Sequence, residues 1–283
     1  IHIDIDRAEL NKNKTVTLPI CADVKTALSQ LLAADPVNRS GWQNYCEALK
    51  RDFPYPSGEG TGISPQKAIS LLSEMTHGEA IVSLGVGQHQ MWAMQHYRSA
   101  RTRSFLSSSG FGTMGYGLPA AIGAKTGCPD RLVIDIDGDG SLNMTIHELS
   151  TCHRYGIGVK VVVINNQWLG MVRQWQDMIY DGHRASSSLS DPRTTDENQN
   201  IYPDFVTIAA GYSVTAERVR DSADLRPAFQ RMLANPEEPY LLDVIVDAEA
   251  NVYPMIPAGA TYKDTIMSDA EHHSTSDFQG NSI

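Results

Sequence analysis

The segments LVIDIDGDGS at residues 132–141 and VKVVVINN at residues 159–166 decide the fold. Each begins with an apolar run of strand length and ends in small polar residues. The 24 residues 141–164, between Gly140 and Asn165, hold a predicted helix at 145–154 and the second strand at 159–164. Because such strand–helix–strand units are right-handed, both strands should end at the same edge of a parallel sheet. The unbroken apolar run at 159–164 is typical of a parallel strand buried on both faces.

The same alternation of strand and helix extends outward in both directions. Further strands are predicted at residues 1–5, 80–84 and 240–246, and helices at 22–32, 64–75, 119–126 and 202–210 and after Ser222. Ser64 followed by Pro65 is a typical helix start, with Ser as the N-cap and Pro at the first helical position. The alternation predicts an α/β fold with a parallel sheet and helices on both of its faces.

Composition narrows the class of protein. Hydrophobic residues make up 41% and charged residues 20% of the 283 residues, as in ordinary soluble globular proteins. No apolar run approaches the roughly 20 residues needed to cross a membrane. The net charge of −10 disfavours nucleic acid and anionic membranes as partners. The four cysteines form no CxxC pair, and no secretory signal opens the chain, which favours a cytoplasmic protein with reduced thiols. A plastid or a mitochondrion stays possible if a transit peptide is missing.

The polar ends of the two deciding strands have the groups that a magnesium ion needs. Asp139 offers a carboxylate oxygen, Asn166 an amide oxygen, and a backbone carbonyl near Trp168 a third ligand. Mg²⁺ prefers octahedral oxygen ligands and usually shares them with phosphate oxygens and water. Gly138 and Gly140 allow a close backbone approach, and the helix expected after residue 141 directs free N–H groups at an anion. GDG or NN alone is more often a plain turn; their pairing at two strand ends favours the metal site.

Four further motifs carry a family resemblance. They are GQHQMW at 87–92, SGFGTMGYGLPAA at 109–121, NNQWLGMVRQW at 165–175 and YPMIPAGAT at 253–261. Together with GDGS…NN they resemble the C-terminal part of acetohydroxyacid synthase (acetolactate synthase), a thiamine-diphosphate enzyme family, over about residues 1–267. The opening HIDID, NKNK and CADVK resemble the end of that family's central, flavin-carrying domain. Other thiamine enzymes share GDG…NN but, as a rule, lack the HQMW and LGMVxQW pair.

The resemblance implies a domain plan. Residues 1–34 would be the C-terminal remnant of the central FAD-associated α/β domain, and residues 35–62 a linker rich in Pro, Gly and Ser. Residues 63–267 would form the thiamine-diphosphate/Mg-binding domain, a three-layer α/β/α parallel sheet of the thiamine-diphosphate-binding fold. Residues 268–283 would be a disordered polar tail.

The resemblance also assigns site residues. Asp139, Asn166 and the Trp168 carbonyl would bind magnesium, and Met114 would be the apolar wedge that bends the cofactor. Met91 and Trp175 would face the substrate, although Trp175 could instead pack against a partner subunit. Asp4, Ile5, Asp23 and Val24 would contact FAD, although a strand and a helix start explain them equally well. The implied cofactor-binding residues are Val86, Gly87, Gln88, His89, Gly112, Met114, Gly138, Asp139, Gly140, Ser141, Asn166, Trp168, Leu169, Gly170, Met171 and Val172.

The implied activity is that of an acetolactate synthase catalytic subunit, using thiamine diphosphate, Mg²⁺ and a structural FAD. Pyruvate would be decarboxylated and joined to a second 2-ketoacid, pyruvate or 2-ketobutyrate, giving acetolactate or acetohydroxybutyrate for branched-chain amino acids. The family's activating glutamate lies in an N-terminal domain of the partner chain, and Glu148 is in the wrong domain to replace it. No catalytic residue is therefore expected in this chain, which alone should bind cofactor weakly and turn over nothing. A homodimer or tetramer with the site across the interface is expected, with a possible small regulatory subunit.

Three alternatives stay open. The chain could belong to another thiamine-diphosphate-dependent 2-ketoacid decarboxylase or carboligase, or it could be a non-catalytic cofactor- and metal-binding subunit. GFGTMG at 110–115 also spells the GxGxxG of dinucleotide-binding proteins, but only Asp135 and Asp137 approach the position of the acidic residue that such a site requires.

Overall fold

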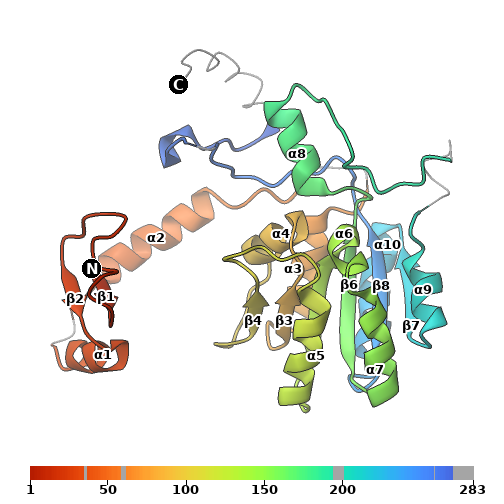
Figure 1. Ribbon diagram of the computed structural model, residues 1–283, viewed down its shortest axis with the longest axis horizontal. Coiled ribbons are helices and arrows are strands. Elements are labelled where there is room, and N and C mark those ends of the chain that lie inside the picture. The colour runs from red at the N-terminus through yellow and green to blue at the C-terminus, as the bar shows by residue number, and fades with distance from the viewer. Residues whose placement is uncertain (35–36, 59–61, 194–200, 258, 270–283) are drawn as a thin grey trace. The chain divides into compact units, whose positions relative to one another are not determined.

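The computed structural model describes residues 1–34, 37–58, 62–193, 201–257 and 259–269 (Figure 1). Contacts divide the chain into two compact units, Ile1–Pro54 and Tyr55–Ile283. The boundary falls inside the segment predicted to be a linker. All but the first two residues of the predicted polar tail, 268–283, lie outside the described residues.

Unit 1 is small and carries one parallel strand pair. Strands β1 (His2–Asp4) and β2 (Pro19–Cys21) pair in parallel, and helices α1 (Val24–Leu32) and α2 (Ser40–Asp52) follow. The Asp23 side chain caps α1 by accepting a hydrogen bond from the Thr26 N–H. Helix α2 departs from the predicted irregular linker. Proline and glycine cluster only after residue 53, whereas residues 42–52 contain neither and read as helix formers.

Unit 2 is built on one six-stranded sheet whose strands all run parallel, in the order β4-β3-β5-β6-β8-β7. From β3 the chain steps to β4 at one edge, then returns past β3 to β5 and continues toward the other edge. The direction of winding therefore reverses between β3 and β5. The strands are β3 (Ile81–Leu84), β4 (Phe105–Ser107), β5 (Val133–Gly138), β6 (Val159–Asn165), β7 (Thr215–Val219) and β8 (Tyr240–Ile245).

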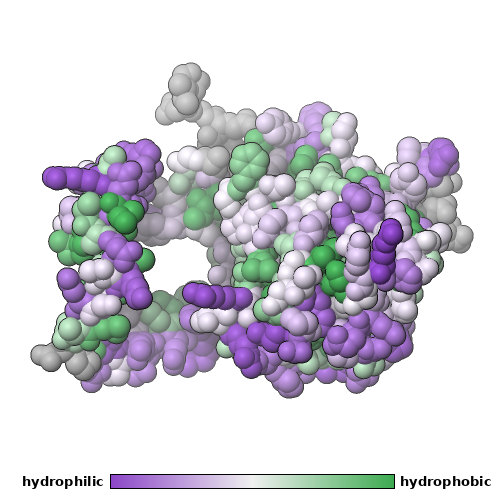
Figure 2. Space-filling view, turned by 60° about the horizontal axis from the view of Figure 1, so that its bottom comes forward, coloured by the Kyte–Doolittle hydropathy of each residue, from purple (hydrophilic) through white to green (hydrophobic). Residues whose placement is uncertain are grey.

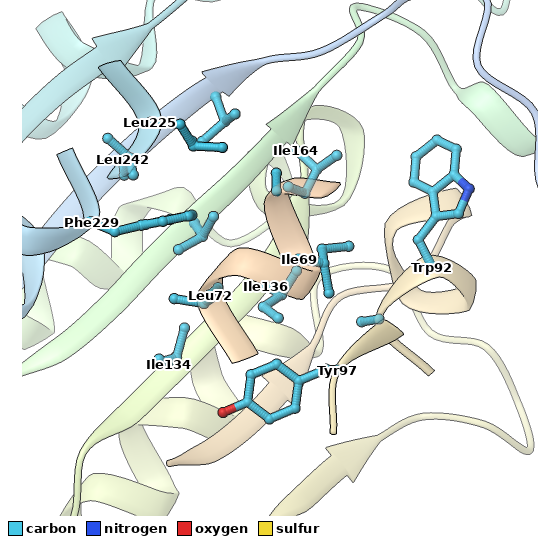
Figure 3. Packing of buried hydrophobic residues seen from close by; sticks show 14 of the residues in the cluster. Ile69, Leu72, Trp92, Tyr97, Ile134, Ile136, Ile164, Leu225, Phe229 and Leu242 are labelled. Atoms are coloured by element: carbon cyan, nitrogen blue, oxygen red, sulfur yellow. The ribbon is translucent and has the colours of Figure 1, made fainter. Parts of the chain in front are cut away.

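Helices cover both faces of this sheet, which confirms the predicted three-layer α/β/α architecture. One face packs against α3 (Pro65–Met75), α4 (Gln88–His96) and α10 (Ser222–Leu233), and Figure 3 shows the apolar side chains that fill this layer. The other face packs against α5 (Gly117–Gly127), α7 (Leu149–Tyr155) and α9 (Phe205–Gly211). The remaining helices are α6 (Asp139–Asn143), α8 (Gly170–Ile179) and the 3₁₀ turns Ile146–Glu148 and Tyr262–Asp264. The helix predicted at 145–154 thus begins as a 3₁₀ turn and continues as α7.

Strand β5 divides its side chains between the two layers. Ile134 and Ile136 join the core under α3 and α10, and Val133 joins the core under α5 and α7. Because side chains alternate along a strand, Asp135 and Asp137 point to the same layer as Val133. Both are completely buried, so this layer holds two carboxyl groups beneath the end of the strand.

The face of the molecule seen in Figure 2 is mostly polar. Figure 2, turned so that the lower part of Figure 1 comes forward, shows hydrophilic residues over much of that side, with apolar residues in small groups between them. Within the described parts of the chain, none of the helices has the length and apolar character that crossing a membrane would require.

Candidate cofactor and metal site

A pocket opens at the carboxyl ends of β3, β5 and β6. Every predicted cofactor-binding residue except Gly112 lines it, together with Trp92 and Ile164. These residues come from three separate segments, 86–92, 138–141 and 164–172, and Met114 stands alone between them. The β3–β5 neighbourhood is also where the winding reverses, which is the place where open α/β sheets bind ligands.

Asp139 is the only carboxylate among the described residues that line this pocket, and one of its two oxygens has no hydrogen-bond partner there. Its side chain is almost buried at 4% exposure, and its Oδ1 accepts a hydrogen bond of 2.9 Å from the Gly140 N–H. Its Oδ2 is buried without a hydrogen-bond partner among the described residues. Burial raises the pKa of Asp139 to about 7, against the opposing effect of the hydrogen bond from the Gly140 N–H. A buried carboxylate oxygen without a donor is well suited to a cation.

Asn166 is placed beside this carboxylate by the pairing of β5 with β6. The register sets Gly138 opposite Ile164, so the residues that follow each strand lie at neighbouring strand tips. The Asn166 Oδ1 accepts from the Trp168 N–H at 3.1 Å, and its Nδ2 donates to the Gln88 Oε1 at 3.1 Å. Between them, Gln167 takes a left-handed backbone conformation with φ of 60°, which folds the chain sharply at this point.

The backbone around Trp168 is held on both sides. The Gln167 carbonyl accepts from the Leu189 N–H at 2.8 Å, and the Leu169 N–H donates to the Ser187 carbonyl at 2.7 Å. The Arg184 guanidinium lies over the Trp168 ring, 5.1 Å from its centroid. The described residues contain no group of three or more His, Cys, Asp or Glu side chains that could hold a metal ion. One carboxylate, one amide and one carbonyl therefore suit a hard cation that shares phosphate oxygens, rather than a closed protein cage.

Three helices begin at the pocket. The first residues of α4, α6 and α8 all line it, so N–H groups at three helix starts point toward one place. The sequence predicted none of these three starts, because the helix expected after residue 141, at 145–154, is the 3₁₀ turn followed by α7. Helix α4 was not predicted because its apolar residues follow no helical period. The Ser141 hydroxyl, 1% exposed, accepts from the Val86 and Gly115 N–H groups and so ties the glycine-rich turns together.

Two buried acids, Asp135 and Asp137, form a floor beneath the pocket lining, and the sequence did not reveal their role. The His89 Nε2 lies 3.4 Å from the Asp137 Oδ1, and the Ser83 hydroxyl donates to the Asp135 Oδ1 at 3.2 Å. Burial lowers the pKa of His89 to about 3 and raises that of Asp137 to about 7, so the histidine is held neutral. His89 was predicted to contact a diphosphate; it lines the pocket, but its ring is directed to this floor. Asp135 and Asp137 are fully buried and unavailable to a ribose, which counts against the dinucleotide-binding alternative.

The neutral state of His89 has a consequence for acid stability. The folded pKa of about 3 lies below the ordinary histidine value of 6.5, so the folded state resists protonation and stability falls as the pH drops from 6.5 toward 3. From the size of the shift, this group alone is expected to cost up to roughly 5 kcal/mol over that range. Urea denaturation at several pH values should show a shallower acid loss for His89→Gln than for the wild type. Parallel curves for the two proteins would contradict the assignment.

The remaining predicted site residues lie apart from the pocket lining. Met91 on α4 is 38% exposed, and Trp175 on α8 is 43% exposed, each on a helix that begins at the pocket. Gly112 lies in the turn after β4, where an added Cβ would stand 3.9 Å from the Val86 Cγ1 of the pocket lining. In unit 1, Asp4 pairs with Cys21 in the strand register, so the predicted FAD-contacting residues gather at one edge of that strand pair. Both acids there have local roles, Asp4 accepting from the Asp6 N–H and Asp23 capping α1.

The comparison with known families decides the assignment. The family model described as "Thiamine pyrophosphate enzyme, C-terminal TPP binding domain" matches residues 85–244, which include every residue that lines the pocket. The chain belongs to the thiamine pyrophosphate enzyme family. Thiamine pyrophosphate is thiamine diphosphate, so the family predicted from GDGS…NN is confirmed.

Individual relatives show which enzymes of this family the chain is similar to. The chain is 49% identical over 275 residues to "Acetolactate synthase 1, chloroplastic" of rice, covering 94% of this chain and 42% of that protein. It is 48% identical over 275 residues to "Acetolactate synthase, chloroplastic" of Arabidopsis thaliana, covering 94% of this chain and 40% of that protein. Among solved structures, the thiamine diphosphate-dependent 4-hydroxybenzoylformate decarboxylase of Rhodococcus jostii RHA1 superposes with a TM-score of 0.69 at 25% identity, over 88% of this chain and 44% of that one. The chain thus spans less than half the length of the proteins it matches.

Proposed function

We propose that this chain carries the magnesium and diphosphate half of the thiamine-diphosphate site of an acetolactate synthase catalytic subunit. The observation that carries the proposal is the unpaired Asp139 Oδ2, buried at one strand tip beside Asn166 at the next. The similarity to acetolactate synthases over 94% of the chain supports this choice of enzyme.

The residues present fit the group. Asp139, Asn166 and the Trp168 carbonyl would hold Mg²⁺, which would supply positive charge to offset the negative charge of the diphosphate. The helix starts at Gln88, Asp139 and Gly170 would offer N–H groups to the diphosphate oxygens. Met114 would support the cofactor from below as the apolar wedge; in the structure its Cε lies 3.5 Å from where a Cβ on Gly140 would stand. Bound thiamine diphosphate supplies the electron sink that stabilises a carbanion after loss of carbon dioxide.

The protein's part in the reaction is to bind, orient and exclude water. The reaction proposed for the whole protein is the decarboxylation of pyruvate and the joining of the two-carbon unit to a second 2-ketoacid. Met91 and Trp175 are proposed to approach the substrates, and the start of each of their helices at the pocket supports this. The activating glutamate would come from a partner subunit, so an oligomer with the site at its interface is part of the proposal. FAD is proposed to bind at the edge of the unit 1 strand pair, near Asp4, Ile5, Asp23 and Val24.

Product analysis tests the proposed reaction. The complete catalytic subunit that contains this chain is purified and supplied with thiamine diphosphate, Mg²⁺, FAD and pyruvate. It is expected to form acetolactate, and acetohydroxybutyrate when 2-ketobutyrate is added. The same preparation should release FAD on denaturation. Free aldehyde as the main product would instead support the other candidate, a 2-ketoacid decarboxylase, which the structural similarity to the Rhodococcus decarboxylase favours. Cofactor binding without turnover would support the non-catalytic subunit.

We propose the cellular compartment from the names of the relatives rather than from the cysteine content. The rice and Arabidopsis relatives are named chloroplastic, which supports a plastid over the cytoplasm for this protein. Imaging of the complete coding sequence fused to a fluorescent protein distinguishes the two.

A further inference from the structure

A chain of three side-chain amides runs through the protein behind the pocket. The Asn166 Nδ2 donates to the Gln88 Oε1 at 3.1 Å, and the Gln88 Nε2 donates to the Gln174 Oε1 at 2.9 Å. Gln174 then meets the backbone of Val252, donating to its carbonyl at 3.0 Å and accepting from its N–H at 2.9 Å. The three amide side chains are 6%, 3% and 0% exposed, so water does not compete for their hydrogen bonds.

The orientation of all three amide groups is fixed at the Val252 end of this row of hydrogen bonds. A backbone N–H can only donate and a backbone carbonyl can only accept, so Val252 determines which end of the Gln174 amide is oxygen. That oxygen requires the NH₂ group of Gln88, and the Ala250 carbonyl, 3.2 Å from the Gln88 Nε2, requires the same. The Gln88 oxygen must then face Asn166, which must present its NH₂ group. The Asn166 oxygen is left to the Trp168 N–H and to the pocket.

We infer that Gln88 and Gln174 are positioning residues that orient the metal ligand Asn166, and that the backbone of residues 250–252 sets their direction. The inference rests on the proposed function, since it assigns a role toward the magnesium ion. A reversed Asn166 amide would turn N–H groups toward a cation and face the donors of Trp168 with another donor. Groups behind a metal ligand commonly fix its orientation in this way.

Two further features agree with this role. Gly170 leaves the room that the amides use, because a Cβ there would lie 2.0 Å from the Gln88 Oε1 and 2.7 Å from the Asn166 Nδ2. The Gln88 side chain uses its oxygen and its NH₂ group within the chain. Gln88 was predicted to bind the cofactor; with its side chain engaged by the other amides, its backbone N–H at the first residue of α4 is the group left for that contact.

Metal affinity measured on a double-mutant cycle tests the inference. The full chain with saturating thiamine diphosphate is titrated with Mn²⁺ in place of Mg²⁺, and free Mn²⁺ is followed by electron paramagnetic resonance. The variants are Gln88→Met, Gln174→Met and the double variant; methionine keeps the length of the side chain, and Gln174 already lies beside Met178 and Met255. Gln95→Met is the matched control, because Gln95 is on the same helix as Gln88 and bonds the Tyr253 carbonyl but has no bond to the chain of amides.

Gln88→Met is expected to weaken Mn²⁺ binding by about 10- to 100-fold, and Gln174→Met by about 10-fold, as removal of groups behind metal ligands usually does. Gln174 does not line the pocket, so its effect must pass through Gln88. Gln174→Met should therefore cause no further loss of Mn²⁺ affinity in a protein that already carries Gln88→Met. If the two substitutions instead damaged the fold independently, their effects on affinity would add. Gln95→Met should change binding less than about twofold.

Two results would overturn the inference. One is that the two substitutions weaken Mn²⁺ binding additively; the other is that Gln88→Met binds Mn²⁺ like the wild type. Failure of the wild type itself to bind Mn²⁺ with thiamine diphosphate would instead overturn the proposed function, so the two failures are distinguishable.

Discussion

Replacing Asp139 with Asn is expected to weaken Mg²⁺ binding in the presence of thiamine diphosphate by at least about 100-fold. Groups that only orient metal ligands already contribute about 10- to 100-fold, so loss of the single charged ligand should exceed that range. Asn keeps the size of Asp and an oxygen for the Gly140 N–H, so the shape of the turn should survive. The measurement is calorimetric titration of Mg²⁺, with Asp130→Asn at an exposed position as the matched control.

The same substitution should stabilise the protein when no metal is bound. The folded pKa of Asp139 is about 7 against the ordinary aspartate value of 3.8, so the folded state holds a proton that the unfolded state releases. Stability contributed by this proton is present below pH 3.8 and is lost as the pH rises toward 7. A shift of this size corresponds to about 4 kcal/mol, which an uncharged Asn does not lose.

Without metal, Asp139→Asn should therefore unfold at a higher temperature than the wild type at pH 8, and at a similar temperature at pH 4. Added Mg²⁺ and thiamine diphosphate should reverse the order at pH 8, because only the wild type gains binding energy. A variant that is less stable than the metal-free wild type at pH 8 would show that the carboxylate has a structural role.

The motifs at strand ends could be predicted because their chemistry is local. GDGS and NN follow apolar runs of strand length, and the right-handed connection brings them to one sheet edge whatever the rest of the chain does. Figure 1 shows the outcome, with α4, α6 and α8 all at the same end of the sheet. The other residues of the pocket lining were predicted from the resemblance of their motifs to the family.

Features that depend on distant partners could not be predicted. The bond from Asn166 to Gln88 spans 78 residues and that from Gln88 to Gln174 spans 86, and neither glutamine differs in sequence from one exposed to water. Asp135 and Asp137 look like polar interruptions of a strand until Gly85 and Gly117 are seen to make room for them. Helix α2 was hidden because proline and glycine in the next ten residues dominated the composition of its segment.

Gly117→Ala is expected to destabilise the folded protein by about 3 kcal/mol, the upper end of the usual cost of overpacking. Gly117 begins α5 over the floor of the pocket. An added Cβ would lie 2.3 Å from the Asp135 Oδ1, 2.7 Å from the Gly85 backbone nitrogen and 2.9 Å from the Asp137 Oδ2. Neither carboxyl group can turn away, because both are fully buried on β5. The helix start must therefore lift from the sheet, which also displaces the strand end that carries Asp139.

Gly123→Ala is the matched substitution, because Gly123 lies on the same helix and a Cβ there would meet nothing within 4 Å. Alanine at that position should stabilise the protein by about 0.5–1 kcal/mol, since it favours the helix and restricts the unfolded chain. Urea denaturation midpoints measure both changes, provided that the slopes stay equal. If the two substitutions changed the stability of the protein equally, the close approach of Gly117 to Asp135 would not be needed for folding. Opposite signs on one helix, with Mg²⁺ affinity lost only in Gly117→Ala, would show that the buried acids and the metal site depend on the same close approach of α5 to β5.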